Sequence, residues 1–337
     1  MEIQIFQHHP VIGYTFIPNL KTRIEHESGG YLLRTNAAGF RSEREFEKQK
    51  LEGMFRILLF GDSFTAGDAV SNKHRFGDVL ETLLPRVEVY NFGLPGTGTD
   101  QHYLVWHEIA REYEYDLVVI ASQVENIRRV AARHRLSATA SGEQVLFAKP
   151  YFELNDANEL DLKGVPVPKE PVALDDLPES EREFVDQGGR MLWLRSLVNK
   201  MGNPVKDLAQ RISGYQPLPE YDDAGSSEWL LMRAIFDVWT KEISRAAVIM
   251  PVPIYHYVEE TADPHAYRER FAELAGLPNV TVHDPLPDYL TVPKSERRVF
   301  RFPTDIHPTP AHHRLLAESL AKRVRSFMAS AEGASAV

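Results

Sequence analysis

One serine, one histidine and one aspartate in this sequence have the types and neighbours that nucleophilic catalysis needs. Ser63 follows the apolar run Ile57 to Phe60 and stands in a Gly-Asp-Ser turn. A serine hydroxyl becomes a nucleophile only when a base takes its proton, and a carboxylate usually orients that base. Asp305 and His307 lie in a proline-bounded loop directly before the last predicted helix, where side chains can reach into a cleft. These three residues form our candidate catalytic set.

A glycine-rich loop offers groups that would stabilise the oxyanion in such a site. Residues 91–101 read NFGLPGTGTDQ, and their backbone N–H groups are free to point into a site. The spacing of Gly93, Gly96 and Gly98 does not match the dinucleotide fingerprint, so nucleotide binding is disfavoured. Taken singly, these features also fit a capped helix, a solvent-exposed loop histidine and an ordinary strand-to-helix connection.

The elements around these residues predict how they are brought together. Strand-like runs alternate with segments of helical spacing, which is typical of βαβ units and a parallel sheet. The predicted strands are 56–60, 87–93, 116–122, 246–253 and 279–285, and the predicted helices include 76–85, an amphipathic helix over 99–113, 263–277 and 310–328. Open sheets of this kind bind ligands at the carboxyl ends of their strands, where Ser63 would lie.

The chain divides into a main domain and two additions. We predict an N-terminal extension packed on the main domain over 1–53, an α/β domain over 54–130 and 227–330, and a cap insertion over 131–226. The insertion is expected to hold short strands with a turn at Asn155-Asp156, followed by a helix over 190–202. It is far longer than ordinary connections, which favours a role in the substrate wall.

Composition excludes several classes of function. The chain has 337 residues, 43% of them hydrophobic, and a formal net charge of -10, which argues against a nucleic-acid partner. It has no cysteine, so a thiolate metal site is excluded, and no metal or organic cofactor is implied. No run is long enough for a membrane span and the N-terminus does not look like a secretory signal, so we expect a cytoplasmic protein.

The order of these blocks resembles the SGNH/GDSL hydrolases. GDSF follows the first strand, Asn-x-Gly-x-x-Gly follows the second, an asparagine follows the third, and Asp with His precedes the last helix. The resemblance implies a three-layer α/β/α sandwich with a flavodoxin-like parallel sheet. It also implies Ser63 as nucleophile, His307 as base and Asp305 as its orienting group. The oxyanion hole would comprise the N–H groups of Ser63 and Gly96 and the side-chain amide of Asn126.

Two departures from the family pattern leave alternatives open. The third block usually reads Gly-x-Asn-Asp, whereas here Glu125 occupies the asparagine position and Asn126 the aspartate position. A carboxylate cannot donate to an oxyanion, so either the loop shifts to present Asn126 or the third donor is altered. The Asp-x-His spacing is also shorter than the commoner Asp-x-x-His, and Asp284 is a second candidate for the orienting carboxylate.

The resemblance implies a serine esterase, and we expect it to remove an O-acetyl or other O-acyl group from a carbohydrate or a glycosylated small molecule. The alternatives are an O-acyltransferase with the same site and a catalytically inactive carbohydrate-binding protein. Glu125, Arg128 and Arg129 are candidate substrate contacts. The arginines of this run, which also include Arg133 and Arg135, would bind an acidic substrate, although an arginine run also fits a solvated helical face. The partner is thus a small-molecule or carbohydrate acyl ester, and the oligomeric state stays open.

Overall fold

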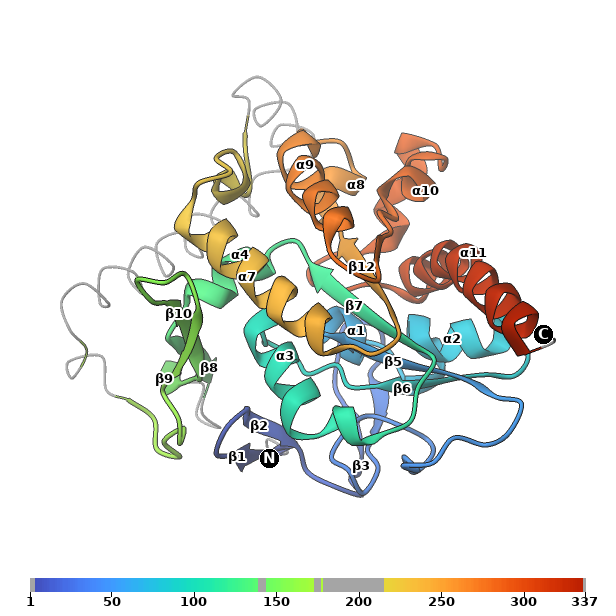
Figure 1. Ribbon diagram of the computed structural model, residues 1–337, viewed down its shortest axis with the longest axis horizontal. Coiled ribbons are helices and arrows are strands. Elements are labelled where there is room, and N and C mark those ends of the chain that lie inside the picture. Colours follow the sequence, from blue (N-terminus) through green and yellow to red (C-terminus); the bar gives the residue numbers. More distant parts are fainter. Residues whose placement is uncertain (1–3, 139–143, 173–176, 178–214, 336–337) are drawn as a thin grey trace.

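A five-stranded parallel sheet forms the centre of the protein (Figure 1). The computed structural model describes residues 4–138, 144–172, 177 and 215–335. Across the sheet the strands run β13 (Val280–Val282), β12 (Ala246–Val252), β7 (Leu117–Gln123), β5 (Phe55–Gly61) and β6 (Val87–Asn91). This is the flavodoxin order, in which the strand that comes first in the sheet's chain order lies second from one edge. The predicted parallel α/β sheet is confirmed.

The middle strands are buried on both faces, as their apolar runs predict. Every residue of β5 and of β7 is buried. Their parallel register pairs Gly61 with Ala121, so both strands end at the same edge of the sheet. Side chains that follow these two strands are therefore brought close together.

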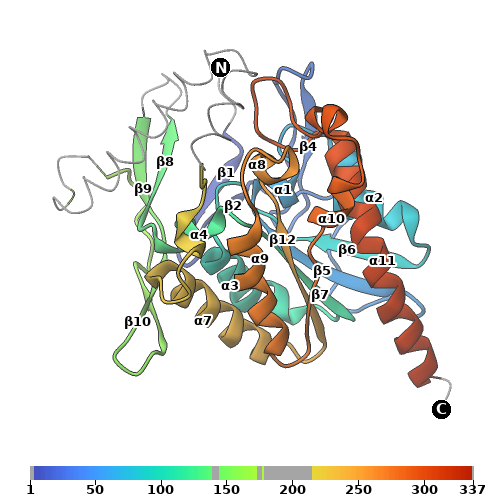
Figure 2. The ribbon, with the colours of Figure 1, turned by 90° about the horizontal axis from the view of Figure 1, so that it is seen from above.

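Helices cover both faces of the sheet. On one face α2 (Phe76–Leu83) packs against α11 (Pro310–Ser335), and on the other lie α3 (Thr99–Glu108), α7 (Ser227–Glu242) and α9 (His265–Glu273) (Figure 2). The short helices are α1 (Ser63–Ala66), α4 (Asn126–Ala131), α8 (Tyr255–Val258) and α10 (Leu286–Leu290), with 3-10 turns at Asn72–His74, Ala110–Glu112, Pro219–Tyr221, Leu274–Gly276 and Lys294–Phe300. The result is the expected three-layer sandwich.

Helix α3 corrects one expectation. Residues 99–106 are all buried, so only the last two residues of the helix, His107 and Glu108, reach solvent. The additions to the domain cover it: the buried Lys149 ammonium of the insertion pairs with Asp100, and Gln101 Nε2 donates to the Ile12 carbonyl of the extension at 2.8 Å. The prediction of an amphipathic helix was wrong because local spacing carries no information about distant segments that pack over it.

The N-terminal extension consists of two small hairpins that reach the carboxyl edge of the sheet. The hairpins are β1 (Phe6–His9) with β2 (Gly13–Phe16), and β3 (Lys21–Ile24) with β4 (Tyr31–Arg34). Beyond them the fully buried Arg41 donates to the carbonyls of Gly67 at 2.6 Å and Val70 at 2.8 Å. Those carbonyls follow α1, so the extension braces the segment after Ser63.

The described part of the insertion also forms two hairpins. They are β8 (His134–Ala138) with β9 (Gln144–Ala148), and β10 (Tyr151–Leu154) with β11 (Leu160–Lys163), the second turning at Asn155-Asp156 as predicted. Phe152 is buried with its ring 5.8 Å from that of Tyr103, so β10 is packed into the main core. The predicted helix over 190–202 lies outside the described residues.

A membrane-spanning helix would need a long apolar stretch. Within the residues that the structure describes, no helix combines sufficient length with sufficient apolarity to cross a bilayer.

Candidate active site

Ser63 lies at the switch point of the sheet. It is the first residue of α1 and follows β5, whose neighbours β6 and β7 lie on opposite sides. Asp62 caps α1, because its Oδ1 accepts the Phe64 N–H at 2.9 Å. The helix is therefore capped by Asp62 and not by Ser63. The Ser63 hydroxyl lies at the edge where open α/β sheets bind ligands, which suits a nucleophile.

The glycine-rich loop is locked against α1. Asn91 Nδ2 donates to the Thr65 carbonyl at 2.8 Å, and Asn91 Oδ1 accepts the Gly93 N–H at 2.9 Å. A Cβ at Gly93 would lie only 2.5 Å from the backbone nitrogen of Ala66, so a larger residue would push the loop away. Gly96, with φ of 74°, adopts a conformation that favours glycine. The loop thereby presents its backbone beside the candidate nucleophile.

Asn126 is the buried polar residue at the end of β7. It begins α4 and is fully buried, and neither Nδ2 nor Oδ1 has a hydrogen-bond partner in the described part of the chain. A buried amide without a partner costs about 1–3 kcal/mol, and an oxyanion bound at this strand end would supply the missing acceptor for Nδ2. Glu125, by contrast, is half-buried and precedes the helix.

The two arginines proposed as substrate contacts are held by acidic residues. Arg129 Nη1 lies 2.8 Å from Asp62 Oδ2 and donates to the Thr97 carbonyl at 3.0 Å. Arg128 forms a two-bond ion pair with Glu220, in which Nη2 and Oε2 are 3.2 Å apart. Burial raises the pKa of Asp62, and the Arg129 charge opposes that shift. Arg129 thus ties α4 to the serine turn and to the glycine-rich loop.

Asp305 and His307 form a hydrogen-bonded pair despite their short spacing. His307 Nδ1 lies 2.6 Å from Asp305 Oδ1, and the His307 backbone N–H donates to the same oxygen at 2.9 Å. With Nδ1 carrying the proton, Nε2 is the nitrogen left to accept one. Asp284, the second candidate for the orienting carboxylate, instead pairs with Arg268 at 2.6 Å. The carboxylate that contacts His307 is therefore that of Asp305.

The surroundings of this pair favour a charged imidazole. Burial by itself lowers the pKa of His307, but the hydrogen bond that its ring donates to Asp305 and the negative charges of Asp68 and Asp62 outweigh it and raise the pKa above 6.5. Burial likewise raises the pKa of Asp305, yet the bonds from His307 and His26 hold it well below its usual range. An imidazole that gains a proton easily suits a general base.

The structure brings the serine and histidine segments together through the residue after Ser63. The rings of Phe64 and His307 have centroids 5.8 Å apart. Among the described residues no hydrogen bond joins Ser63 Oγ to His307, and such bonds often tighten only when substrate binds.

Four further side chains lie near the site; Tyr14, His26 and Glu27 carry no signal in the sequence, whereas Arg135 belongs to the arginine run after the third strand. Tyr14 donates to the Pro95 carbonyl in the glycine-rich loop, and the Arg135 guanidinium lies 4.0 Å over the Tyr14 ring. His26 and Glu27 contact the loop of Asp305, as described below. All four come from the extension or the insertion, and only the long-range packing shows that they meet the catalytic blocks.

The fold and the family define the class of protein, a serine ester hydrolase. The chain belongs to the GDSL-like lipase/acylhydrolase family, whose profile matches residues 57–320. This membership favours an active enzyme over a catalytically inactive carbohydrate-binding protein. No curated protein sequence matches the chain. Across the described residues, no cluster of three or more histidine or acidic side chains could hold a metal ion.

Solved structures of the family are similar to the chain in fold. A lipolytic G-D-S-L protein from Veillonella parvula is 13% identical over 80% of this chain and 97% of that chain, with a TM-score of 0.40. The lipase/acylhydrolase from Enterococcus faecalis is 14% identical over 81% and 96%, with a TM-score of 0.42. An acetyl xylan esterase is 12% identical over 80% and 100%, with a TM-score of 0.42.

Proposed function

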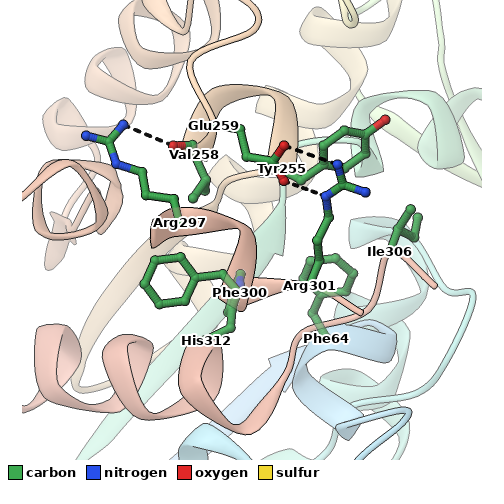
Figure 3. A pocket seen from close by; sticks show the side chains of 9 residues that line it. All are labelled: Phe64, Tyr255, Val258, Glu259, Arg297, Phe300, Arg301, Ile306 and His312. Atoms are coloured by element: carbon green, nitrogen blue, oxygen red, sulfur yellow. Dashed lines mark hydrogen bonds and ion pairs between the residues drawn. The ribbon is translucent and has the colours of Figure 1, made fainter. Parts of the chain in front are cut away.

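We propose that this esterase removes an O-acetyl group from a carbohydrate or a glycosylated small molecule through an acyl-enzyme on Ser63. The observation that carries the proposal is a recess beside the serine turn, lined by Phe64 and by Ile306 among others (Figure 3). Phe64 directly follows the proposed nucleophile and Ile306 directly precedes the proposed base. Phe64 and Ile306 thus connect the recess to the two segments that carry the proposed nucleophile and base, although Ser63 and His307 do not themselves line it.

The lining of the recess suits a small uncharged acyl group. Phe300 and His312 are among its lining residues, and burial lowers the pKa of His312 to about 3, so this imidazole carries no charge at neutral pH. The lining also includes the Arg301 guanidinium, which lies 4.2 Å over the Tyr255 ring and pairs with Glu259. Rings and a charged pair at one rim are the groups that bind a sugar face and its hydroxyls.

The proposed reaction uses five residues of this chain. Ser63 Oγ attacks the ester carbon while His307 Nε2 takes its proton, and Asp305 stabilises the resulting imidazolium. The N–H groups of Ser63 and Gly96 and the amide of Asn126 stabilise the oxyanion. The intermediate expels the sugar oxygen, which takes the proton from His307. A water deprotonated by His307 then attacks the acyl carbon, the bond from that carbon to Ser63 Oγ breaks, and Oγ takes the proton back from His307 as acetic acid leaves and ionises to acetate.

Chain-length and product assays test this proposal. We expect kcat/KM to be highest for p-nitrophenyl acetate and to fall steadily for the butyrate and octanoate, because the recess is too small for a long acyl chain. With an acetylated xylo-oligosaccharide as substrate, released acetate should equal the deacetylated sugar formed. A preference for octanoate would contradict the acetyl proposal, and acetate transfer to an added sugar without equivalent free acetate would favour the O-acyltransferase.

Arg135 is the arginine that we propose as the contact to an acidic sugar, in place of Arg128 and Arg129. It forms no ion pair with any described carboxylate, and its Cδ lies 3.7 Å from the position that a Cβ on Gly96 would occupy. Its charge is therefore placed beside the loop proposed to bind the oxyanion. Arg133, two residues earlier, is the matched control, because it pairs with Glu153 on the insertion.

We expect Arg135→Ala to lower kcat/KM for 4-acetoxybenzoate about tenfold relative to its neutral methyl ester, since a charged hydrogen bond is lost. Arg133→Ala should leave that ratio unchanged. Both variants are compared by the kcat/KM of each ester at low ionic strength, where the charge is least screened. An equal loss on both esters in Arg135→Ala would show that this arginine does not select an acidic substrate.

A further inference from the structure

The turn between β3 and β4 lies against the loop that carries Asp305 and His307. His26 Nε2 is 3.1 Å from Asp305 Oδ2, although the two residues are 279 positions apart in the chain. The neighbouring Glu27 carboxylate accepts the backbone N–H groups of Thr304 at 3.0 Å and Asp305 at 2.8 Å. The start of the chain thus contacts both the side chain and the backbone of the proposed orienting residue.

The loop has little regular structure of its own to hold Asp305 in place. Between the end of the 3-10 turn at Phe300 and the start of α11, a single bridge pairs Arg301 with Pro308. The His26 ring packs edge-on against the ring of Phe302, with centroids 4.7 Å apart. Segments with few backbone hydrogen bonds unfold locally at low cost. Contacts from another segment therefore stabilise the conformation of such a loop.

The two carboxylate oxygens of Asp305 have separate partners. Oδ1 accepts both bonds from His307, and Oδ2 accepts the bond from His26. The Ser28 N–H donates to His26 Nδ1 at 3.2 Å, so the ring proton is on Nε2 and points toward Asp305. A neutral His26 is therefore sufficient. Bonds at both oxygens fix the plane of the carboxylate, and with it the direction in which Oδ1 meets His307.

We infer that His26 and Glu27 are positioning residues that hold Asp305, and through it His307, in the geometry needed for general-base catalysis. The inference rests on the proposed roles of Asp305 and His307. In this scheme His26 acts only on Asp305, and it contacts neither the substrate nor Ser63. The N-terminal extension thereby completes the active site that the family's sheet provides.

Single and double variants assayed with p-nitrophenyl acetate test the inference. His26→Ala should lower kcat about tenfold with KM unchanged, since a small misplacement of a reacting group by a distant change costs up to about a hundredfold. His26→Gln should recover most of that loss, because its amide N–H can replace ring Nε2 as a donor. Glu27→Ala should also lower kcat with KM unchanged. His265→Ala is the matched control, because His265 is an exposed histidine with a carboxylate partner, Glu269, and should retain wild-type kcat.

A double variant separates positioning from general structural damage. In an Asp305→Ala background, His26→Ala should cause no further loss beyond about twofold, because the two residues act in series. Additive losses, or wild-type kcat in both His26→Ala and Glu27→Ala, would overturn the inference. An Asp305→Ala variant with wild-type kcat would instead refute the proposed catalytic pair itself. Thermal unfolding of each variant shows whether it is folded at the assay temperature, and Glu27→Ala changes an exposed side chain should His26→Ala fail to fold.

Discussion

Ser63→Ala and His307→Ala should each lower kcat for p-nitrophenyl acetate by about three orders of magnitude or more, because members of a catalytic triad act as a unit. For the same reason the double variant should be little worse than either single one. Steady-state kinetics and labelling by a fluorophosphonate probe measure the effect, and only Ser63→Ala should abolish labelling completely. Turnover by Ser63→Ala at the wild-type rate would remove Ser63 from the mechanism.

The pH profile gives an independent check on His307. The base must be neutral to accept a proton, and its folded pKa is raised above 6.5. The wild-type kcat/KM should therefore fall as the pH drops through a value above 6.5, and not through the lower value of an ordinary histidine. An acid limb below pH 6.5 would contradict the assignment of His307, with His265→Ala again serving as the control that leaves the limb unmoved.

Asn126→Ala should slow turnover roughly a hundredfold or more, since one oxyanion donor contributes about 2.7–4 kcal/mol to the transition state. The expectation follows from an amide that is fully buried and has no partner among the described residues. Asn126→Asp should be at least as slow, because it keeps the shape but replaces the donor with a negative charge. The measurement is kcat for p-nitrophenyl acetate.

Glu125→Gln is the matched control for the third donor. It keeps the size of a half-buried side chain and should leave kcat within about threefold of wild type, because we assign Glu125 no role in the transition state. A hundredfold loss in Glu125→Gln together with near-normal turnover in Asn126→Ala would reverse the assignment. The shift of the third block by one residue would then be refuted.

The candidate site was predicted best where its parts are local. Gly-Asp-Ser after an apolar strand determines a serine at the end of β5, because strand, turn and cap all lie within a few residues. Asp305 and His307 are two residues apart, so their pairing needs only the conformation of one loop. The parallel sheet could also be predicted from the sequence, since buried strands and the helices between them produce recognisable patterns of apolar residues.

The ion-pair partners of the arginines could not be predicted from local sequence. Arg129 and Asp62 are separated by 67 positions and Arg128 and Glu220 by 92, so nothing near either arginine indicates an ion pair. The sequence interpretation accordingly offered both as substrate contacts, whereas the structure shows each held by a carboxylate of the protein. Which charge meets which depends on how loops from different strands stack at the edge of the sheet.

The sequence by itself therefore determined the class of fold and indicated the proposed reacting groups, because local apolar periodicity and short motifs carry that information. Only the tertiary structure decided what surrounds them: that His26 meets Asp305, that Tyr14 and Arg135 lie beside the glycine-rich loop, and that residues 99–106 of α3 are buried. Each of these contacts joins segments that are far apart in the sequence. The free energy that favours them comes from burial and ion pairing across the whole chain, and a local sequence pattern contains no information about either.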